Sequence, residues 1–144
     1  MRTKSTAKRR RRSSVAVQRA ARGAPAARRL RDWALAAARP GAELTLRVVG
    51  AAEGRRLNRA FRRRDYATNV LAFAYSPTQG DIVLCHPVIA REARAQGKAL
   101  AAHYAHLVVH GALHLRGLRH GRRMERAEVR LLARLGFGDP YTLE

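Results

Sequence analysis

The sequence predicts an α+β fold, a single domain in which helices pack on a small mixed β-sheet. Three observations favour this class. The 144 residues suffice for one domain of ordinary size. Their hydrophobic share of 47% is enough for a core. Most strand-like segments also occur before residue 86, whereas helical patterns dominate after it.

The first half of the chain mixes strands and helices. Val15-Ala16-Val17 is a short β-favouring run. Residues 24–38 read as a helix, with Pro25 in its first turn. Residues 43–49 alternate polar and apolar side chains, as a half-buried strand does, and residues 51–63 follow as a basic helix.

The second half begins with a hairpin and continues as helices. Residues 68–75 and 81–85 favour strands and flank a turn at 76–80. Helical patterns then cover residues 87–96, 99–116 and 122–135. Gly97 and Gly117 stand where helices should stop, because glycine accepts the left-handed backbone that ends a helix.

The charge of the chain points to a polyanionic partner. The sequence has 30 Lys and Arg against 10 Asp and Glu, a net charge of +20, which favours nucleic acid over an acidic membrane surface or an acidic protein. Residues 1–14 are expected to form a basic disordered arm before a single domain at 15–144. The arm contains four candidate RNA-binding residues: Arg9, Arg10, Arg11 and Arg12. A solubilising tail is the alternative interpretation of this segment.

The cysteine content and the hydropathy of the sequence indicate the cellular compartment that we expect for the protein. A single cysteine, Cys85, excludes an internal disulfide and a cysteine-based zinc finger. No apolar run has the length of a membrane span, and no signal-peptide core follows the basic N-terminus. We therefore expect a cytoplasmic protein with no membrane partner. The Arg- and Ser-rich start leaves an organellar transit peptide as the alternative.

Three histidines predict a metal site on a late helix and the turn after it. His110 and His114 are four residues apart on the predicted helix, so they share one face. Gly117 permits a turn that returns His120 to the same point. Three neutral imidazoles with an open fourth position form a catalytic zinc site, so we expect one zinc ion per chain.

The histidine spacing is also that of the metzincin proteases, which need a glutamate base directly after the first histidine. Here that position is Gly111, and no acidic residue occurs between Glu92 and Glu125. A metalloprotease is therefore a distant alternative. Phosphodiester cleavage is less dependent on that carboxylate, because zinc activates water and arginine can hold the developing charge. His103 and His106 share the helical stripe and are expected to be buried partners rather than ligands.

Several further segments carry a resemblance to a known family. They are Leu57 to Arg62, Asp65, Thr68 to Phe73, Gly80 to Cys85, His103 to His120, and Gly138 to Tyr141. On these segments, over roughly residues 40–144, the chain resembles the YbeY family of bacterial endoribonucleases and ribosomal RNA maturation factors.

The resemblance implies both a site and a function. The zinc ligands would be His110, His114 and His120, and the family's functional arginine falls on Arg62, which would grip a phosphate near the metal. The implied activity is a single-strand-specific, zinc-dependent endoribonuclease. It would act on ribosomal RNA and the small ribosomal subunit, mature the 3′ end of 16S ribosomal RNA and serve ribosome quality control. The sequence does not predict the oligomeric state.

Among the departures from the family pattern, two concern the site and leave an alternative function open. Arg119 stands where the family usually has an aspartate, which removes a candidate supporting carboxylate. The stretch Gly121-Arg122-Arg123 is basic where the family is usually acidic. The alternative is a zinc-containing ribosome-binding assembly factor with impaired catalysis.

Overall fold

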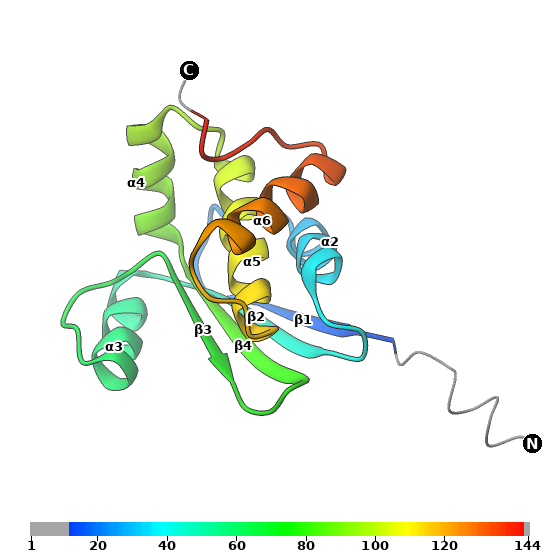
Figure 1. The fold of residues 1–144 in the computed structure, drawn as a ribbon. Helices are drawn as coiled ribbons and strands as arrows, with labels where there is room; N and C mark the ends of the chain where they lie inside the picture. Colours follow the sequence, from blue (N-terminus) through cyan, green and yellow to red (C-terminus); the bar gives the residue numbers. More distant parts are fainter. Residues whose placement is uncertain (1–11, 143–144) are drawn as a thin grey trace, which may run out of the picture.

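Four strands form one mixed sheet in the computed structural model, which describes residues 12–142 (Figure 1). The strands are β1 (Ser14–Arg19), β2 (Glu43–Val49), β3 (Val70–Ala74) and β4 (Gln79–Cys85). Their order is β1-β2-β4-β3, with β1, β2 and β4 parallel and β3 antiparallel to β4. The predicted hairpin and the small mixed sheet are confirmed.

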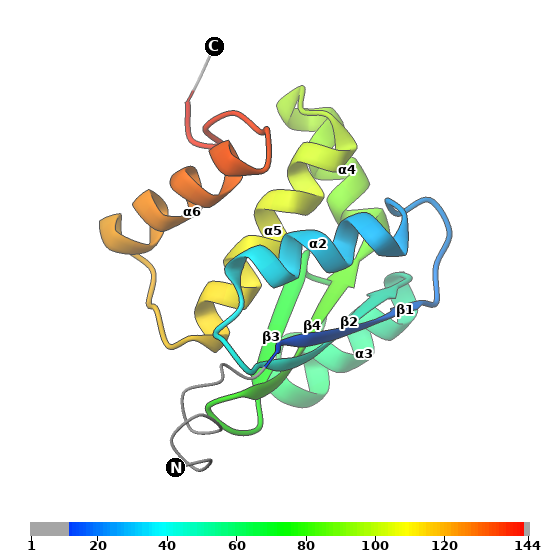
Figure 2. The ribbon, with the colours of Figure 1, turned by 90° about the vertical axis from the view of Figure 1, so that its right-hand side faces the viewer.

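Five helices pack around this sheet in the described residues. They are α2 (Ala27–Ala37), α3 (Ala51–Arg62), α4 (His86–Gln96), α5 (Leu100–Leu115) and α6 (Arg122–Arg134). Helices α2 and α5 cover one face of the sheet, α3 lies on the other, and α6 packs on the outside of α5 (Figure 2). None of the described helices has both the length and the apolar character needed to span a bilayer.

The alternation of side chains in the strands creates a core on each face. Leu44, Leu46 and Val48 of β2 are buried against α2 and α5 in the main core. Val83 and Cys85 of β4 point the other way, into a smaller core that α3 joins through Leu57. The α+β prediction is therefore confirmed, with the larger core on the side that carries α5.

The start of α2 differs from the prediction. The helix begins at Ala27, so the expectation that Pro25 occupies its first turn is wrong. Ala24 precedes a proline, which disfavours a helical backbone. Its carbonyl also accepts a hydrogen bond from Arg19 Nη2 at 3.0 Å, which holds the chain in the connection from β1.

Two strands extend beyond their predicted bounds. β4 begins at Gln79, inside the expected turn, because the Tyr75 amide donates to the Gln79 carbonyl at 2.8 Å and continues the hairpin. β1 begins at Ser14, which pairs with Glu43 of β2 although it was expected to belong to the arm. The rest of the expected arm, up to residue 11, lies outside the described residues.

The turn after α5 prepares the site. Gly117 has φ +95°, and its amide donates to the His114 carbonyl at 2.9 Å. The next amide, that of Leu118, donates to the Leu113 carbonyl at 3.1 Å, which completes the usual glycine-dependent helix ending. The predicted stop at Gly117 is confirmed, and the chain reverses immediately after α5.

Candidate metal centre

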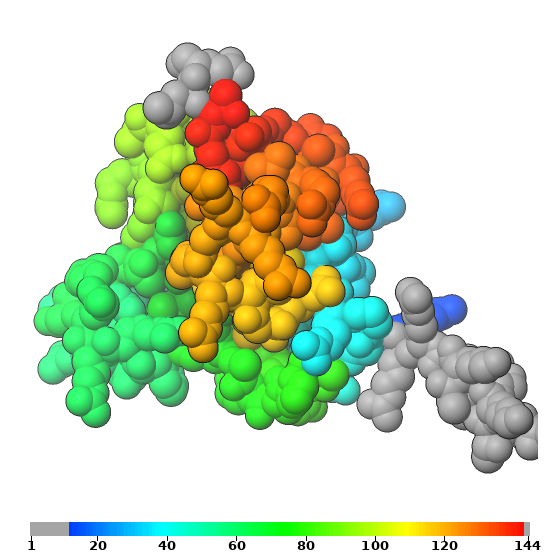
Figure 3. All heavy atoms as spheres, viewed as in Figure 1, coloured from blue at the N-terminus to red at the C-terminus, as the bar shows by residue number. Residues whose placement is uncertain are grey.

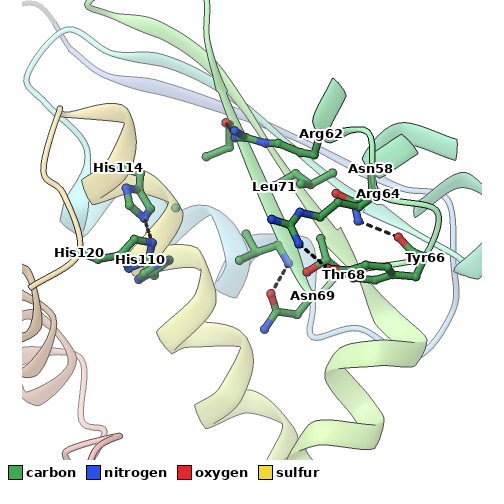
Figure 4. Close-up of a pocket in the computed structure, with 13 residues that line it drawn as sticks. Asn58, Arg62, Arg64, Tyr66, Thr68, Asn69, Leu71, His110, His114 and His120 are labelled. Atoms are coloured by element: carbon green, nitrogen blue, oxygen red, sulfur yellow. Dashed lines mark hydrogen bonds between the residues drawn. The ribbon is translucent and has the colours of Figure 1, made fainter. Parts of the chain in front are cut away.

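The structure brings the three predicted ligands together. His110 and His114 lie on the last turns of α5, and the Gly117 turn places His120 beside them (Figure 4). One ring nitrogen from each lies within 4.8 Å of the others, and His114 Nε2 is 3.1 Å from His120 Nε2. Two nitrogens bound to a tetrahedral zinc at about 2.0–2.1 Å would be about 3.3 Å apart. The cluster therefore fits this metal.

Hydrogen bonds select the ring nitrogens that face the cluster. His114 Nδ1 lies 3.0 Å from the Leu118 carbonyl, which can only accept, so the proton is on Nδ1 and Nε2 keeps a lone pair. Burial lowers the pKa of His114, and the neighbouring His110 and His120 lower it further. A lowered pKa favours the neutral form of His114, which is the form that binds a metal.

A buried carboxylate supports His110. Glu128 of α6 is completely buried, and its carboxylate accepts hydrogen bonds from His110 Nδ1 at 2.5 Å, from His106 Nε2 at 3.3 Å and from the Tyr141 hydroxyl. Burial alone would raise the pKa of Glu128, but these hydrogen bonds outweigh it and lower the pKa to about 2. A charged carboxylate behind a ligand histidine fixes its orientation and increases its basicity.

Glu128 was not among the predicted site residues, although the sequence of α6 contains a signal for it. Met124, Glu128 and Leu132 are spaced by four residues and form the buried stripe of α6, so the carboxylate occupies an apolar face. A charge in such a position needs partners. Arg119 was expected to leave the histidines without a supporting carboxylate. Glu128 provides such a carboxylate from α6.

The other two histidines of α5 lie outside the cluster, as expected. His103 is buried, and its Nε2 lies 2.9 Å from Glu92 Oε1. His106, His110 and Glu128 also form a group that could hold a cation. In that group, His106 Nε2 and His110 Nδ1 already donate hydrogen bonds to the Glu128 carboxylate. We therefore assign His106 a supporting role.

A pocket of about 610 Å³ separates the histidines from a basic wall. Arg62 and Arg64, from the end of α3 and the loop after it, line the wall opposite His110, His114 and His120 (Figure 4). Arg62 Nη2 donates to the Ala72 carbonyl of β3 at 3.3 Å, and its guanidinium carbon lies 5.9 Å from the centre of the Phe73 ring.

Arg64 is a second pocket residue that was not predicted from the sequence. Arg63 ends α3 in the left-handed conformation, with φ +58°, and reverses the chain so that Arg64 also lines the pocket. Buried Asn58 fixes this loop, because its Nδ2 donates to the Tyr66 carbonyl at 2.7 Å. The sequence did not predict a left-handed residue here, because the position holds arginine rather than glycine.

Of the four arginines predicted to bind RNA from the arm, the structure describes Arg12. Arg12 is exposed before β1 and does not line the pocket. β1 and β3 form opposite edges of the sheet, and β3 is the strand that borders the pocket. Arg9, Arg10 and Arg11 lie outside the described residues.

Comparison with known proteins gives one consistent family. Residues 10–136 match the family model described as Endoribonuclease YbeY. The Endoribonuclease YbeY of Aromatoleum aromaticum is 56% identical over 125 residues, which cover 81% of this chain and 81% of that protein. The Endoribonuclease YbeY of Bordetella pertussis is 60% identical over 111 residues, which cover 70% of this chain and 71% of the relative.

A solved structure shares the fold. The solution structure of the Thermotoga maritima protein TM1509 superimposes with a TM-score of 0.62 at 21% identity, covering 90% of this chain and all of that one. Helices on a small mixed sheet, with a histidine cluster where α5 ends, thus coincide with a family match over most of the sequence. The chain belongs to the YbeY family of endoribonucleases.

Proposed function

We propose that the chain is a zinc-dependent endoribonuclease that cleaves single-stranded RNA at the His110, His114 and His120 centre. One observation carries the proposal: three imidazoles that can hold a metal face two arginines across a single open pocket. Such an arrangement suits a phosphodiester, which presents an anionic group to arginine and a reactive phosphorus to the metal side.

Each part of the pocket has a role in the proposed reaction. Zinc, when bound, would act as a Lewis acid and make water or a ribose hydroxyl more nucleophilic at neutral pH. His110 and His114 would hold it through Nε2, in orientations set by Glu128 and the Leu118 carbonyl. Arg62 and Arg64 would bind the phosphate and offset the charge that develops on it.

The proposed substrate is ribosomal RNA. We infer that the enzyme acts on the small ribosomal subunit, matures the 3′ end of 16S ribosomal RNA and takes part in ribosome quality control in the cytoplasm. The net charge of +20 and the family resemblance support an RNA partner. Cleavage of a precursor extended beyond the 16S 3′ end, compared with an unrelated RNA of equal length, tests this specificity.

The competing functions are less well supported. Structural zinc usually has four protein ligands, whereas only three histidines converge here. That difference favours a catalytic site over an assembly factor that uses zinc for structure alone. A protease would need a base at Gly111, but a Cβ at that position would lie 3.1 Å from Ile82 Cγ2. Helix α5 therefore has little room for a longer side chain there.

Metal content and single-turnover cleavage, measured together, test the proposal. His114→Ala should lose zinc and cleavage together. Arg62→Ala should keep zinc and lose cleavage by about ten to a thousandfold, as expected for an electrostatic stabiliser. Arg59→Ala is the matched control, because Arg59 is exposed on the same helix and does not line the pocket. Undiminished cleavage by His114→Ala would disprove the proposal.

A further inference from the structure

A second basic surface lies on the other side of the loop that joins α5 and α6. It is a groove of about 330 Å³, which we call the α6 groove. Its rim consists of four arginines and its floor of small or apolar residues. These residues are Arg116, Arg123, Arg130, Arg134, Leu113, Leu118, Ala127 and Leu131.

The sequence of α6 places these arginines in one stripe. Arg123, Arg130 and Arg134 follow one another at spacings of seven and four residues, which keeps them on the same side of the helix. From Arg123 to Arg134 the stripe extends over about 16 Å, at about 1.5 Å of rise per residue. Arg116, at the end of α5, adds a fourth cation from across the groove.

Among the described residues, the guanidinium groups of the groove have no acidic partner. None of the three α6 arginines forms an ion pair or a side-chain hydrogen bond with a described residue. Arg116 Nη1 makes one contact, to the Ala37 carbonyl at 3.3 Å. Like charges gathered around one groove repel one another, so an anionic ligand would stabilise this arrangement.

One loop forms part of both the groove and the metal site. Leu118 lines the groove, and its carbonyl accepts the hydrogen bond from His114 Nδ1. His120, two residues later, belongs to the metal cluster. The loop and the start of α6 form a ridge between the α3 side and the α2 side of the molecule (Figure 3). A ligand in the groove is thus separated from the metal centre by the width of one loop.

From these observations we propose that the α6 groove is a second RNA contact surface, which holds the phosphates of the strand that continues beyond the metal centre. The apolar floor would accept a nucleobase, and the arginine rim would neutralise the backbone. The inference rests on the proposed function for the identity of the ligand. It adds that a long single strand crosses the α5–α6 loop, whereas a short one occupies only the pocket.

The salt dependence of RNA binding tests this surface. The double variant Arg123→Gln/Arg134→Gln removes two groove cations at exposed helical positions. The control Arg91→Gln/Arg94→Gln removes two exposed cations from α4, a helix that lines neither the groove nor the pocket. The probes are single-stranded 2′-O-methyl RNAs of about 4 and about 12 nucleotides with phosphorothioate linkages, which lack the ribose nucleophile and resist hydrolysis by water. Only the longer probe should reach from the pocket to the groove.

The expected result is a change in slope for the longer probe only. Each lost phosphate contact flattens the plot of log affinity against log salt by about 0.7 for a single strand, so the groove variant should lose about 1.4. The control variant should keep the wild-type slope, and the short probe should bind the groove variant and the wild type alike. If the double variant does not fold, each single variant should lose about 0.7.

Three results would overturn the proposal. In the first, the groove variant binds the longer probe with the same salt dependence as the wild type. In the second, the slope of the control variant falls as much as that of the groove variant. The third concerns an acidic peptide of the same charge as the RNA. If this peptide displaces the probe from the wild type as well as RNA does, but does not displace it from the groove variant, the ligand of the groove is a protein. Binding requires no cleavage, so these results stay distinct from a failure of the metal and cleavage tests.

Discussion

Glu128 is a completely buried carboxylate, and such a group persists in a protein only where hydrogen bonds replace its hydration. Its three donors come from two parts of the chain: His106 and His110 lie on α5, and Tyr141 lies near the end of the described residues. The same carboxylate therefore orients a proposed metal ligand and attaches the C-terminal segment to α6. Its removal should affect metal binding before it affects the fold as a whole.

Replacing Glu128 by glutamine tests this role. Glu128→Gln should weaken zinc binding by about ten- to a hundredfold, because the amide is a poorer acceptor for His110 Nδ1 and carries no charge. Competition with a chromophoric chelator gives the dissociation constant directly. Glu125→Gln, an exposed change of equal charge on the same helix, should leave the constant unchanged. Equal affinities for the wild type and Glu128→Gln would show that the carboxylate only supports packing.

His86 gives a prediction for pH dependence away from the metal centre. Its Nδ1 lies 2.7 Å from the Tyr104 hydroxyl, and its ring stacks on the Tyr104 ring. Burial lowers the pKa of His86, and nearby Arg94 lowers it further. The folded state therefore binds this proton less readily than the unfolded state. Its contribution to stability is present above pH about 6.5 and is lost as the pH falls toward the lowered pKa.

Urea unfolding of metal-free protein at pH 7.5 and pH 5.5 measures this contribution. His86→Gln should lose less stability between the two pH values than the wild type, because the variant has no proton to take up at this position. Every other histidine is common to the two proteins and cancels in the comparison. An equal loss in both proteins would mean that His86 titrates alike in the folded and unfolded states.

At the scale of elements, the order of strands and helices could be predicted because each has a periodic pattern or a turn signal. The ends were harder where tertiary contacts decide them. Ser14 becomes part of β1 only because β2 lies beside it, and Ala24 stays out of α2 partly because Arg19 binds its carbonyl. The left-handed ending of α3 at Arg63 was also not predictable, because arginine does not favour that backbone.

The ends of α3 and α4 make a matched pair for mutagenesis. Gly97 and Arg63 have nearly the same backbone, with φ +65° and +58°. A Cβ at Gly97 would meet no atom within 4 Å, so Gly97→Ala should lower the free energy of unfolding by about 1 kcal/mol through backbone strain alone. Arg63→Gly should raise it by up to about 1 kcal/mol. Urea unfolding at fixed zinc content measures both changes. If the two substitutions change the free energy of unfolding in the same direction, backbone strain does not explain the difference between the two positions.

At the scale of the whole molecule, the charge predicted a polyanionic partner but not the faces that would bind it. The sequence spacing of the three histidines predicted the cluster, because His110, His114 and His120 lie within one helix and the turn after it. Glu128, Arg64 and the α6 groove depend on how α3, α5 and α6 pack, which no local pattern records. Local spacing thus predicted the histidine cluster, and tertiary packing determined its supporting carboxylate and the basic walls.

Deleting residues 2–12 tests the contribution of the arm. The first strand begins at Ser14, so the deletion should leave the folded domain and its zinc content intact. Affinity for RNA should fall, and its salt dependence should flatten, because seven basic residues are removed. Cleavage at saturating RNA should not change. Loss of that cleavage would show that the arm takes part in the reaction rather than in capture alone.

The separation of sheet and site along the chain has a consequence for biosynthesis. All four described strands occur before residue 86, whereas the histidine cluster and its supporting residues extend from His106 to Tyr141. The amino-terminal part of a chain leaves the ribosome first. The sheet can therefore assemble while the residues of the histidine cluster are still being translated. Translation that stops before Glu128 yields a fragment with every described strand but without the carboxylate behind His110, so an unfinished copy lacks a complete version of the metal centre proposed above.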